Sequence, residues 1–263
     1  MTFARFGGSA KPPAHALEFA RRDVLPRSGP VATFGVRTRA MSAAATNNDT
    51  ASDPATRDPI DAIYGARQVS CRMFETPLIE RFSRVHWSTP FLFWLPVLAF
   101  VSYHSFTAGV TVGPFVGLVL AGIFVWTFAE YCLHRWVFHY IGPRPWQRRM
   151  NFILHGVHHD FPQDAGRLVM PLGASIPMAA FFYVLFRLIA GPVYAHPFFV
   201  GFGLGYLAYD GTHFAVHHFR MSTRIGKWIK RYHMIHHHTG VDARYGVSSP
   251  LWDYVFRTHG GES

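Results

Sequence analysis

Histidine is the residue type that stands out in this chain of 263 residues, which contains 17 of them. Fourteen fall at or after position 134, and most of these lie in short clusters. A neutral imidazole is a nitrogen ligand for zinc, iron, copper or nickel, so the clusters predict metal chemistry. The four clusters are His134 and His139; His155, His158 and His159; His213, His217 and His218; and His233, His236, His237 and His238.

The spacing within the clusters suits a shared metal centre. Residues three and four apart lie on one face of a helix, so each of the three later clusters can aim imidazoles at one point. The five-residue spacing of His134 and His139 separates their rings by about 140° on an α-helix. We expect these two to reach a centre from different sides, or with the helix ending between them. Ten nitrogen donors are too many for one ion of about four to six ligands and suit two ions.

Two acidic residues precede clusters at helical spacing. Glu130 lies four residues before His134, and Asp210 lies three residues before His213. A carboxylate that accepts the distal N–H of a metal-bound imidazole fixes its tautomer and ring angle, and we expect this role for both. The alternatives are that each acid caps a helix end or is solvated at the membrane interface.

Other catalytic motifs are missing from the sequence. It contains neither the His-Glu-x-x-His motif of zinc proteases nor a serine nucleophile elbow. The glycines of Gly201-Phe-Gly-Leu-Gly205 lie in an apolar stretch rather than a phosphate-binding loop, and they predict close helix packing.

Long uncharged segments indicate how the histidines are positioned. Residues 85–129 contain no Asp, Glu, Lys or Arg, and neither do 168–186 and 188–209. A bilayer is crossed by about 20 apolar residues of helix, so we expect membrane spans rather than the buried core helices of a soluble protein. The four predicted spans are near 89–106, 112–130, 169–188 and 194–212.

The charge distribution predicts the orientation of these spans. The connections 107–113 and 189–195 contain no Lys or Arg, whereas the segment before the first span, the loop 131–168 and the C-terminal stretch 213–263 hold nearly all of the 25 in the chain. Positive charge stays on the cytosolic side, which also explains much of the formal charge of +10 without nucleic acid. Arg187 is a mild exception. The predicted fold is an all-α integral membrane protein, with four transmembrane helices, both termini in the cytosol, and a cytosolic helical cap that holds a His-rich dinuclear metal site.

The ends of the chain differ in character. Residues 1–67 lack apolar periodicity and predict a disordered tail, a transit peptide, or translated upstream sequence with Met41 as the start; residues 68–263 form the predicted membrane domain. Residues 221–237 predict a basic amphipathic helix at a surface. Two cysteines, Cys71 and Cys132, give no disulfide framework.

The histidine clusters and the residues around them resemble a known group of enzymes. The clusters are similar to the histidine boxes of the membrane-bound fatty acid hydroxylase/sterol desaturase superfamily. Three segments most resemble the sphingolipid fatty acid 2-hydroxylases, and the match covers roughly 70–260. They are His155-Gly-Val-His-His-Asp-Phe-Pro-Gln-Asp-Ala-Gly-Arg-Leu-Val-Met-Pro171, Tyr209-Asp-Gly-Thr-His213 and Tyr245-Gly-Val-Ser-Ser-Pro-Leu-Trp-Asp-Tyr-Val-Phe256.

The resemblance implies a reaction and its ligands. It implies two iron ions and O2 as co-substrate with two reducing equivalents; zinc lies above iron(II) in the affinity order and can displace iron on purification. The substrate is a long-chain acyl lipid, hydroxylated at the carbon next to the carbonyl; that C–H bond is unactivated, so the metal performs the hard chemistry. His218 and His238 are expected beside the ligands. The implied ligands are His134, His139, His155, His158, His159, His213, His217, His233, His236 and His237.

The sequence departs from many eukaryotic relatives in one respect. The His-Pro-Gly-Gly motif of a fused b-type cytochrome domain is absent, so we expect a separate electron donor, either a b-type cytochrome or a ferredoxin with its reductase, docking on the basic surface of 220–231. The expected membrane is the endoplasmic reticulum for a eukaryotic protein and the inner membrane for a bacterial one. Alternatives are a sterol desaturase, a carotenoid hydroxylase, or a non-enzymatic membrane protein that binds metal or haem.

Overall fold

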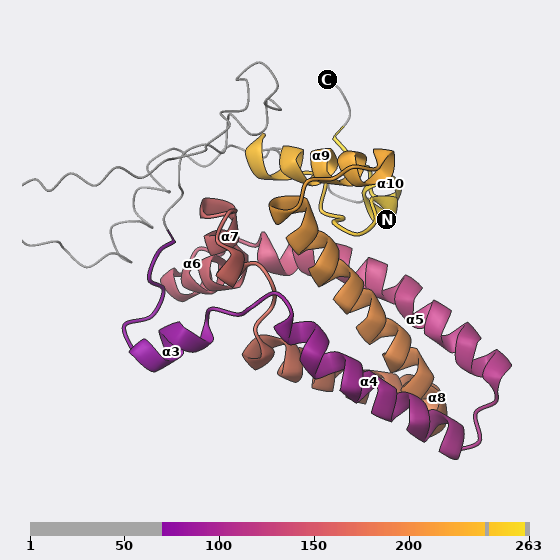
Figure 1. Cartoon of the computed structure of the whole chain (residues 1–263). Coiled ribbons are helices and arrows are strands. Elements are labelled where there is room, and N and C mark those ends of the chain that lie inside the picture. The colour runs from indigo at the N-terminus through magenta and orange to yellow at the C-terminus, as the bar shows by residue number, and fades with distance from the viewer. Residues whose placement is uncertain (1–69, 240–241, 261–263) are drawn as a thin grey trace, which may run out of the picture. The chain divides into compact units, whose positions relative to one another are not determined.

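The structure is a computed structural model that describes residues 70–239 and 242–260; the predicted tail at 1–67 lies outside these residues. The described part of the chain contains helices and no strands, as the sequence predicts (Figure 1). Three helical segments are long and apolar enough to cross a membrane, and they indicate a membrane protein. These are Thr89–Thr107, Val112–Phe138 and Ala165–His218.

The helices differ greatly in length (Figure 1). The long helices α4, α5 and α8 form the bundle, and shorter elements gather at one end of it. In order, the elements are α3 (Pro77–Phe82), α4 (Thr89–Thr107), α5 (Val112–Cys132), the π-helix η2 (Leu133–Phe138), α6 (Pro145–Asn151), the π-helix η3 (Phe152–Gly156), α7 (Val157–Asp160), the 3₁₀-helix η4 (Ala165–Arg167), α8 (Leu172–His218), α9 (Arg224–His238) and α10 (Leu251–Val255).

The element α8 consists of two helical arms separated at Gly191, whose φ of 77° and ψ of 169° are not helical. Glycine adopts a positive φ without steric cost, and the proline that follows it disfavours helical backbone at this position. Phe182 packs against Phe202 and Phe186 against Phe198, each with ring centroids 4.7 Å apart. These pairings, in which one residue number rises as the other falls, place the two arms of α8 antiparallel.

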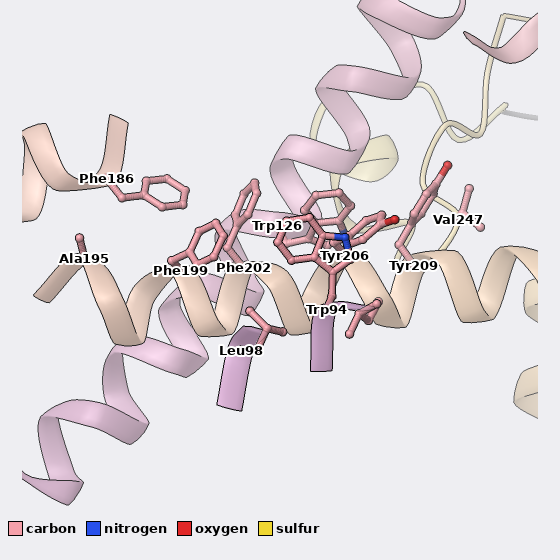
Figure 2. Packing of buried hydrophobic residues seen from close by; sticks show 11 residues of the cluster. Trp94, Leu98, Trp126, Phe186, Ala195, Phe199, Phe202, Tyr206, Tyr209 and Val247 are labelled. Atoms are coloured by element: carbon pink, nitrogen blue, oxygen red, sulfur yellow. The ribbon is translucent and has the colours of Figure 1, made fainter. Parts of the chain in front are cut away.

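The core lies where α5 and α4 meet the second arm of α8, and Trp126 is at its centre (Figure 2). The Trp126 ring lies 5.0 Å from Phe202 and 5.5 Å from Tyr206. Beside it the backbones approach closely, because a Cβ on Gly201 would lie 2.0 Å from the Val119 carbonyl oxygen. Glycine in this stretch therefore permits helix packing, as predicted, in the manner of membrane helices.

The outer faces of the same helices expose large apolar side chains. Leu92 on α4, Leu120 on α5 and Leu188 on α8 are 74%, 61% and 79% exposed. Soluble proteins rarely expose large continuous apolar patches. These faces fit a lipid environment, in which an exposed leucine costs nothing.

Candidate metal centre

The structure gathers ten histidines into two groups of five, which come from η2 and the residue after it, η3, α7, the last turns of α8, and α9. Within each group, one nitrogen of every ring lies within 4.8 Å of all the others. The first histidine group contains His134, His139, His155, His159 and His236. The second histidine group contains His158, His213, His217, His233 and His237.

Distances in the first histidine group match the spacing of ligands around one ion. The Nε2 atom of His134 lies 2.9 Å from that of His155 and 3.2 Å from that of His139. The Nε2 atoms of His139 and His236 are 3.0 Å apart. Two nitrogens bound at right angles, each roughly 2.1 Å from an ion, would be about 3.0 Å apart.

The second histidine group repeats this spacing with side chains from α7, α8 and α9. The Nε2 atom of His233 lies 2.9 Å from that of His217 and 3.0 Å from that of His237. His158 and His237 approach to 3.1 Å. The two groups are neighbours, because the His159 ring of the first stacks on the His237 ring of the second at 4.2 Å.

The expectation that each cluster aims at a single point is wrong for two of the clusters. His155 and His159 face the first group, while His158 between them faces the second. On an α-helix, residues four apart differ by only about 40°, whereas adjacent residues differ by about 100°. Histidines four apart therefore belong to the same group, and the histidine between them belongs to the other. On α9, His233 and His237 belong to the second group and His236 to the first.

The chain uses a π-helix to bring His134 and His139 to one side. The amide of His139 donates to the carbonyl of His134, five residues earlier, at 3.1 Å. This i→i+5 bond is the π-helical pattern, and it stacks residues five apart instead of splaying them by about 140° as an α-helix would. The ring centroids are 4.9 Å apart. The sequence did not predict this winding.

The state of the imidazoles suits metal binding. Burial lowers the pKa of His139 to about 3, and the neighbouring His236 adds to the shift. Burial, with neighbouring histidines, also puts the pKa values of His155, His158 and His233 well below 6.5. These rings are therefore neutral and offer lone pairs, the form that binds a metal ion.

Buried ring nitrogens without a hydrogen-bond partner also indicate a metal site. Both ring nitrogens of His213 are buried without a hydrogen-bond partner within the described residues. A buried polar atom without a partner is costly, and a bound ion would satisfy it. The histidines present therefore fit two metal ions.

Main-chain carbonyls orient two histidines of the first group. The Nδ1–H of His134 donates to the carbonyl of Tyr245, and that of His236 donates to the carbonyl of Ala243 at 2.8 Å. A carbonyl only accepts, so the hydrogen lies on Nδ1 and the Nε2 lone pair faces the centre of the group. These partners could not be predicted from the sequence, because every residue has a carbonyl and no residue type marks the ones that accept from a histidine.

Neither predicted carboxylate bonds to the histidine that it precedes. Glu130 instead accepts from the Val247 and Ser248 amides at 2.7 and 2.8 Å, and from the Ser248 hydroxyl. The expected bond from His213 to Asp210 is also absent, since both ring nitrogens of His213 have no hydrogen-bond partner in the described part of the chain. Asp210 interacts with the backbone amide of Met170. Each carboxylate therefore accepts from backbone amides that are distant in the sequence, in the loop after α9 for Glu130 and just before α8 for Asp210.

The remaining two candidates, His218 and His238, belong to neither histidine group. The His218 ring lies against Phe214, 4.5 Å away, and His238 is exposed beside His237. Their predicted place beside the ligands stays a prediction.

A cavity of about 830 Å³ opens onto both histidine groups. His155 of the first group and His158 and His213 of the second form part of its wall. Most other lining residues are apolar and come from α3, η2, η3 and residues 168–174. A cavity of this size and character accommodates an apolar ligand.

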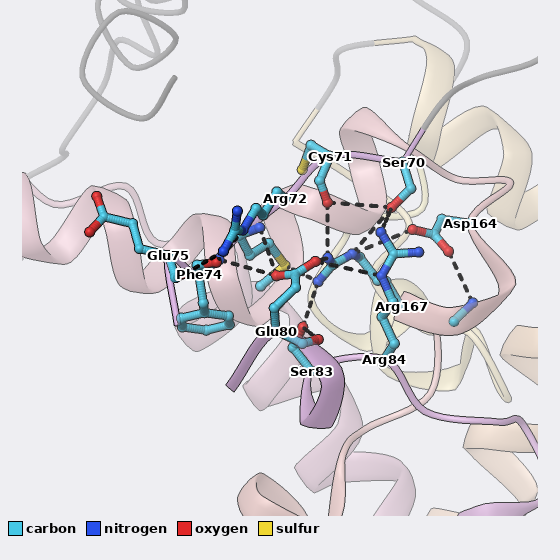
Figure 3. Close-up of polar contacts among 12 residues, drawn as sticks. Ser70, Cys71, Arg72, Phe74, Glu75, Glu80, Ser83, Arg84, Asp164 and Arg167 are labelled. Atoms are coloured by element: carbon cyan, nitrogen blue, oxygen red, sulfur yellow. Dashed lines mark hydrogen bonds and ion pairs between the residues drawn. The ribbon is translucent and has the colours of Figure 1, made fainter. Parts of the chain in front are cut away.

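Arg167 fastens the α3 wall of this cavity to the segment before α8 (Figure 3). Its buried guanidinium pairs with Glu80 and donates at 2.9 Å to both the Cys71 carbonyl and the Ser83 hydroxyl. Glu80 also accepts from the amides of Met73 and Phe74, at 3.0 and 3.1 Å. One buried arginine therefore organises residues 71–83.

A membrane helix bundle that carries two five-histidine groups beside an apolar cavity defines a class of membrane enzymes with a histidine-rich metal site. The fatty acid hydroxylase family model matches residues 119–258. The chain is 38% identical over 174 residues to the dihydroceramide fatty acyl 2-hydroxylase FAH1 of Arabidopsis thaliana, covering 66% of this chain and 73% of that protein. It is 36% identical to the ceramide very long chain fatty acid hydroxylase SCS7 of Saccharomyces cerevisiae, covering 70% of this chain and 48% of that protein.

A solved structure is also similar. The hydroxylase domain of full-length scs7p superposes with a TM-score of 0.67 at 34% identity, covering 72% of this chain and 71% of that chain. The chain belongs to the fatty acid hydroxylase family. It is an oxidoreductase, and its histidine groups are compatible with a metal site.

Proposed function

We propose that this protein hydroxylates a long-chain acyl group of a sphingolipid at the carbon next to the carbonyl, using O2 and two iron ions. The observation that carries the proposal is the apolar cavity, which is lined by histidines of both the first and the second histidine group. The names of the relatives, which act on ceramide or dihydroceramide acyl groups, support the substrate class.

The ten histidines of the two groups would hold the two ions, five each. When bound, the ions supply activation of O2, so that one oxygen atom enters the C–H bond and the other leaves as water, with two electrons and two protons consumed. The imidazoles contribute neutral lone pairs and no proton transfer. The apolar cavity holds the acyl tail, excludes water, and brings the target carbon to the histidines; such positioning contributes much of an enzyme's rate enhancement.

We further propose four membrane crossings with a cytosolic cap. The crossings would be α4, α5 and the two arms of α8 on either side of Gly191. The connections at 108–111 and around Gly191 carry no Lys or Arg, which supports a location opposite the cytosol. Epitope tags before residue 70 and after residue 260 should both be digested from the cytosolic side of sealed vesicles. A protected C-terminal tag would contradict this topology.

A separate reduced carrier would deliver the two electrons. The outer face of α9 supports a docking position for an acidic b-type cytochrome or ferredoxin, because Arg224, Lys227 and Arg231 are exposed and His233, His236 and His237 lie on the same helix. Reversing the charge of these three residues should slow turnover and weaken its dependence on salt. Unchanged rates with a purified carrier would place the donor elsewhere.

The function is tested by lipid mass spectrometry after expression in a host that lacks 2-hydroxylated lipids but has a competent reductase system. Acyl chains of sphingolipids should gain one oxygen atom, and fragmentation should place it at the carbon next to the carbonyl. His236→Ala should abolish the product. His196→Ala is the matched control, because His196 lies near the Gly191 turn beside Tyr183 and belongs to neither group. Hydroxylated sterols or carotenoids instead would refute the proposal.

A further inference from the structure

The two histidine groups differ in how their rings are held. In the first group, His134 and His236 each donate from Nδ1 to a main-chain carbonyl of the loop 243–248. In the second group, the Nδ1 atoms of four rings have no hydrogen-bond partner within the described residues. These four are His213, His217, His233 and His237.

The loop 243–248 is itself fixed by two buried carboxylates, Glu130 and Asp253, which are 3% and 0% exposed. Asp253 accepts from the Tyr245 amide at 2.9 Å and from the Gly246 amide at 2.8 Å. Glu130 holds the next two amides of the loop from the last turn of α5. Four consecutive amides of the loop therefore bind to carboxylate oxygens.

This arrangement leaves the loop little freedom. A Cβ on Gly246 would lie 2.1 Å from the Ser249 carbonyl oxygen. The Thr258 hydroxyl donates to Asp253 at 2.8 Å and also lies 3.1 Å from the Tyr131 hydroxyl of α5. The Tyr245 carbonyl, which accepts from His134, is thus set by contacts to both α5 and α10.

We propose that Glu130 and Asp253 are positioning residues for the first histidine group, and that this group is consequently the tighter of two unequal metal sites. The proposal rests on the proposed function only in that both groups bind a metal ion. The carboxylates act at one remove: they orient amides, the attached carbonyls orient imidazoles, and the imidazoles bind the ion. Loss of a residue that orients a ligand typically costs roughly 10–100-fold in metal affinity, and we expect that range here.

The test is the release of zinc from protein loaded with two zinc ions per chain, followed after addition of excess chelator. Wild type should release one zinc quickly and the other at least about ten times more slowly. His217→Ala should remove the fast phase and His236→Ala the slow one, which assigns each phase to a group. Asp253→Asn turns one carboxylate oxygen into an amide that faces a backbone N–H. It should accelerate the slow phase by roughly 10–100-fold and leave the fast phase unchanged.

Two further variants make the result decisive. Asp164→Asn is the control, because this carboxylate also accepts a backbone amide, from Gly166, but pairs with Arg167; it should alter neither phase. Ser248→Ala removes one hydroxyl from Glu130 without disturbing the main chain, and should accelerate the slow phase less than Asp253→Asn does. It carries the test if Asp253→Asn does not fold.

Three results would overturn the proposal. They are a single phase of zinc release in wild type, equal acceleration of both phases in Asp253→Asn, and an unchanged slow phase in whichever of Asp253→Asn and Ser248→Ala fold. Failure of the protein to bind two zinc ions at all would instead refute the proposed function.

Discussion

Replacing Arg167 by methionine should release the α3 wall of the cavity while leaving both histidine groups intact. The Arg167 side chain is 2% exposed and its ion-pair partner Glu80 is 15% exposed. The replacement removes this ion pair and the bonds to Cys71 and Ser83, but retains a side chain of similar length. Residues 71–85 should then open more often.

The size of the effect follows from the burial of the pair. Removing one partner of a buried ion pair costs about 3–5 kcal/mol. Glu80 keeps two backbone amides and has Arg84 at 3.5 Å, so we expect the lower end, about 3 kcal/mol, which is roughly a 100-fold increase in opening. Arg84→Met is the matched control: Arg84 is 46% exposed, and such a surface pair is worth about 0.3–0.5 kcal/mol, roughly twofold.

Hydrogen exchange of peptides covering 71–86 measures this opening. The informative amides are those of Met73 and Phe74, which bind Glu80, and that of Val85, which donates to the Gly166 carbonyl at 2.8 Å. Arg167→Met should speed their exchange about 100-fold and Arg84→Met about twofold. Equal effects from the two variants, or no effect from Arg167→Met, would refute the view that the buried ion pair holds this wall.

Three further predictions concern packing, pH and Asp210. Gly201→Ala should lower the melting temperature strongly, because its Cβ would meet a backbone oxygen at 2.0 Å, while Gly113→Ala, with open space around it, should not. Burial raises the pKa of Glu80, but its bonds from two amides and a guanidinium outweigh this and hold it below 4.5. Its stabilisation of residues 71–86 should therefore be complete above pH 4.5 and be lost as the pH falls through the lowered pKa, as exchange corrected for intrinsic rates would show. Asp210→Asn should retain two metal ions by elemental analysis, since this carboxylate makes no bond to His213.

Charge and hydropathy predicted the helical membrane character of the chain well, because a long uncharged stretch has few structural outcomes. The predicted segments near 89–106 and 112–130 correspond to α4 and α5. The antiparallel turn at Gly191 also follows a sequence signal, since a Gly-Pro pair interrupts helical backbone.

Details of the metal centre were harder to predict. Spacing identified histidines that share a helix face, but the assignment of His158 and His236 to opposite groups depends on how α7 and α9 are rotated against α8. The π-helical winding between His134 and His139 is a local departure that spacing rules do not include. The direct bonds expected from Glu130 to His134 and from Asp210 to His213 are not formed, because main-chain amides compete for the carboxylates and no residue type marks which amides will do so.

The most direct test of the central claim, that two groups of five histidines bind two metal ions, is elemental analysis of the purified protein normalised to chain concentration. Wild type should contain two metal ions per chain, as iron or as the zinc that displaces it. His236→Ala and His217→Ala should each lose one ion, because they belong to different groups, and His196→Ala should keep both. One ion per wild-type chain, or a His236→Ala variant that retains two, would contradict the claim.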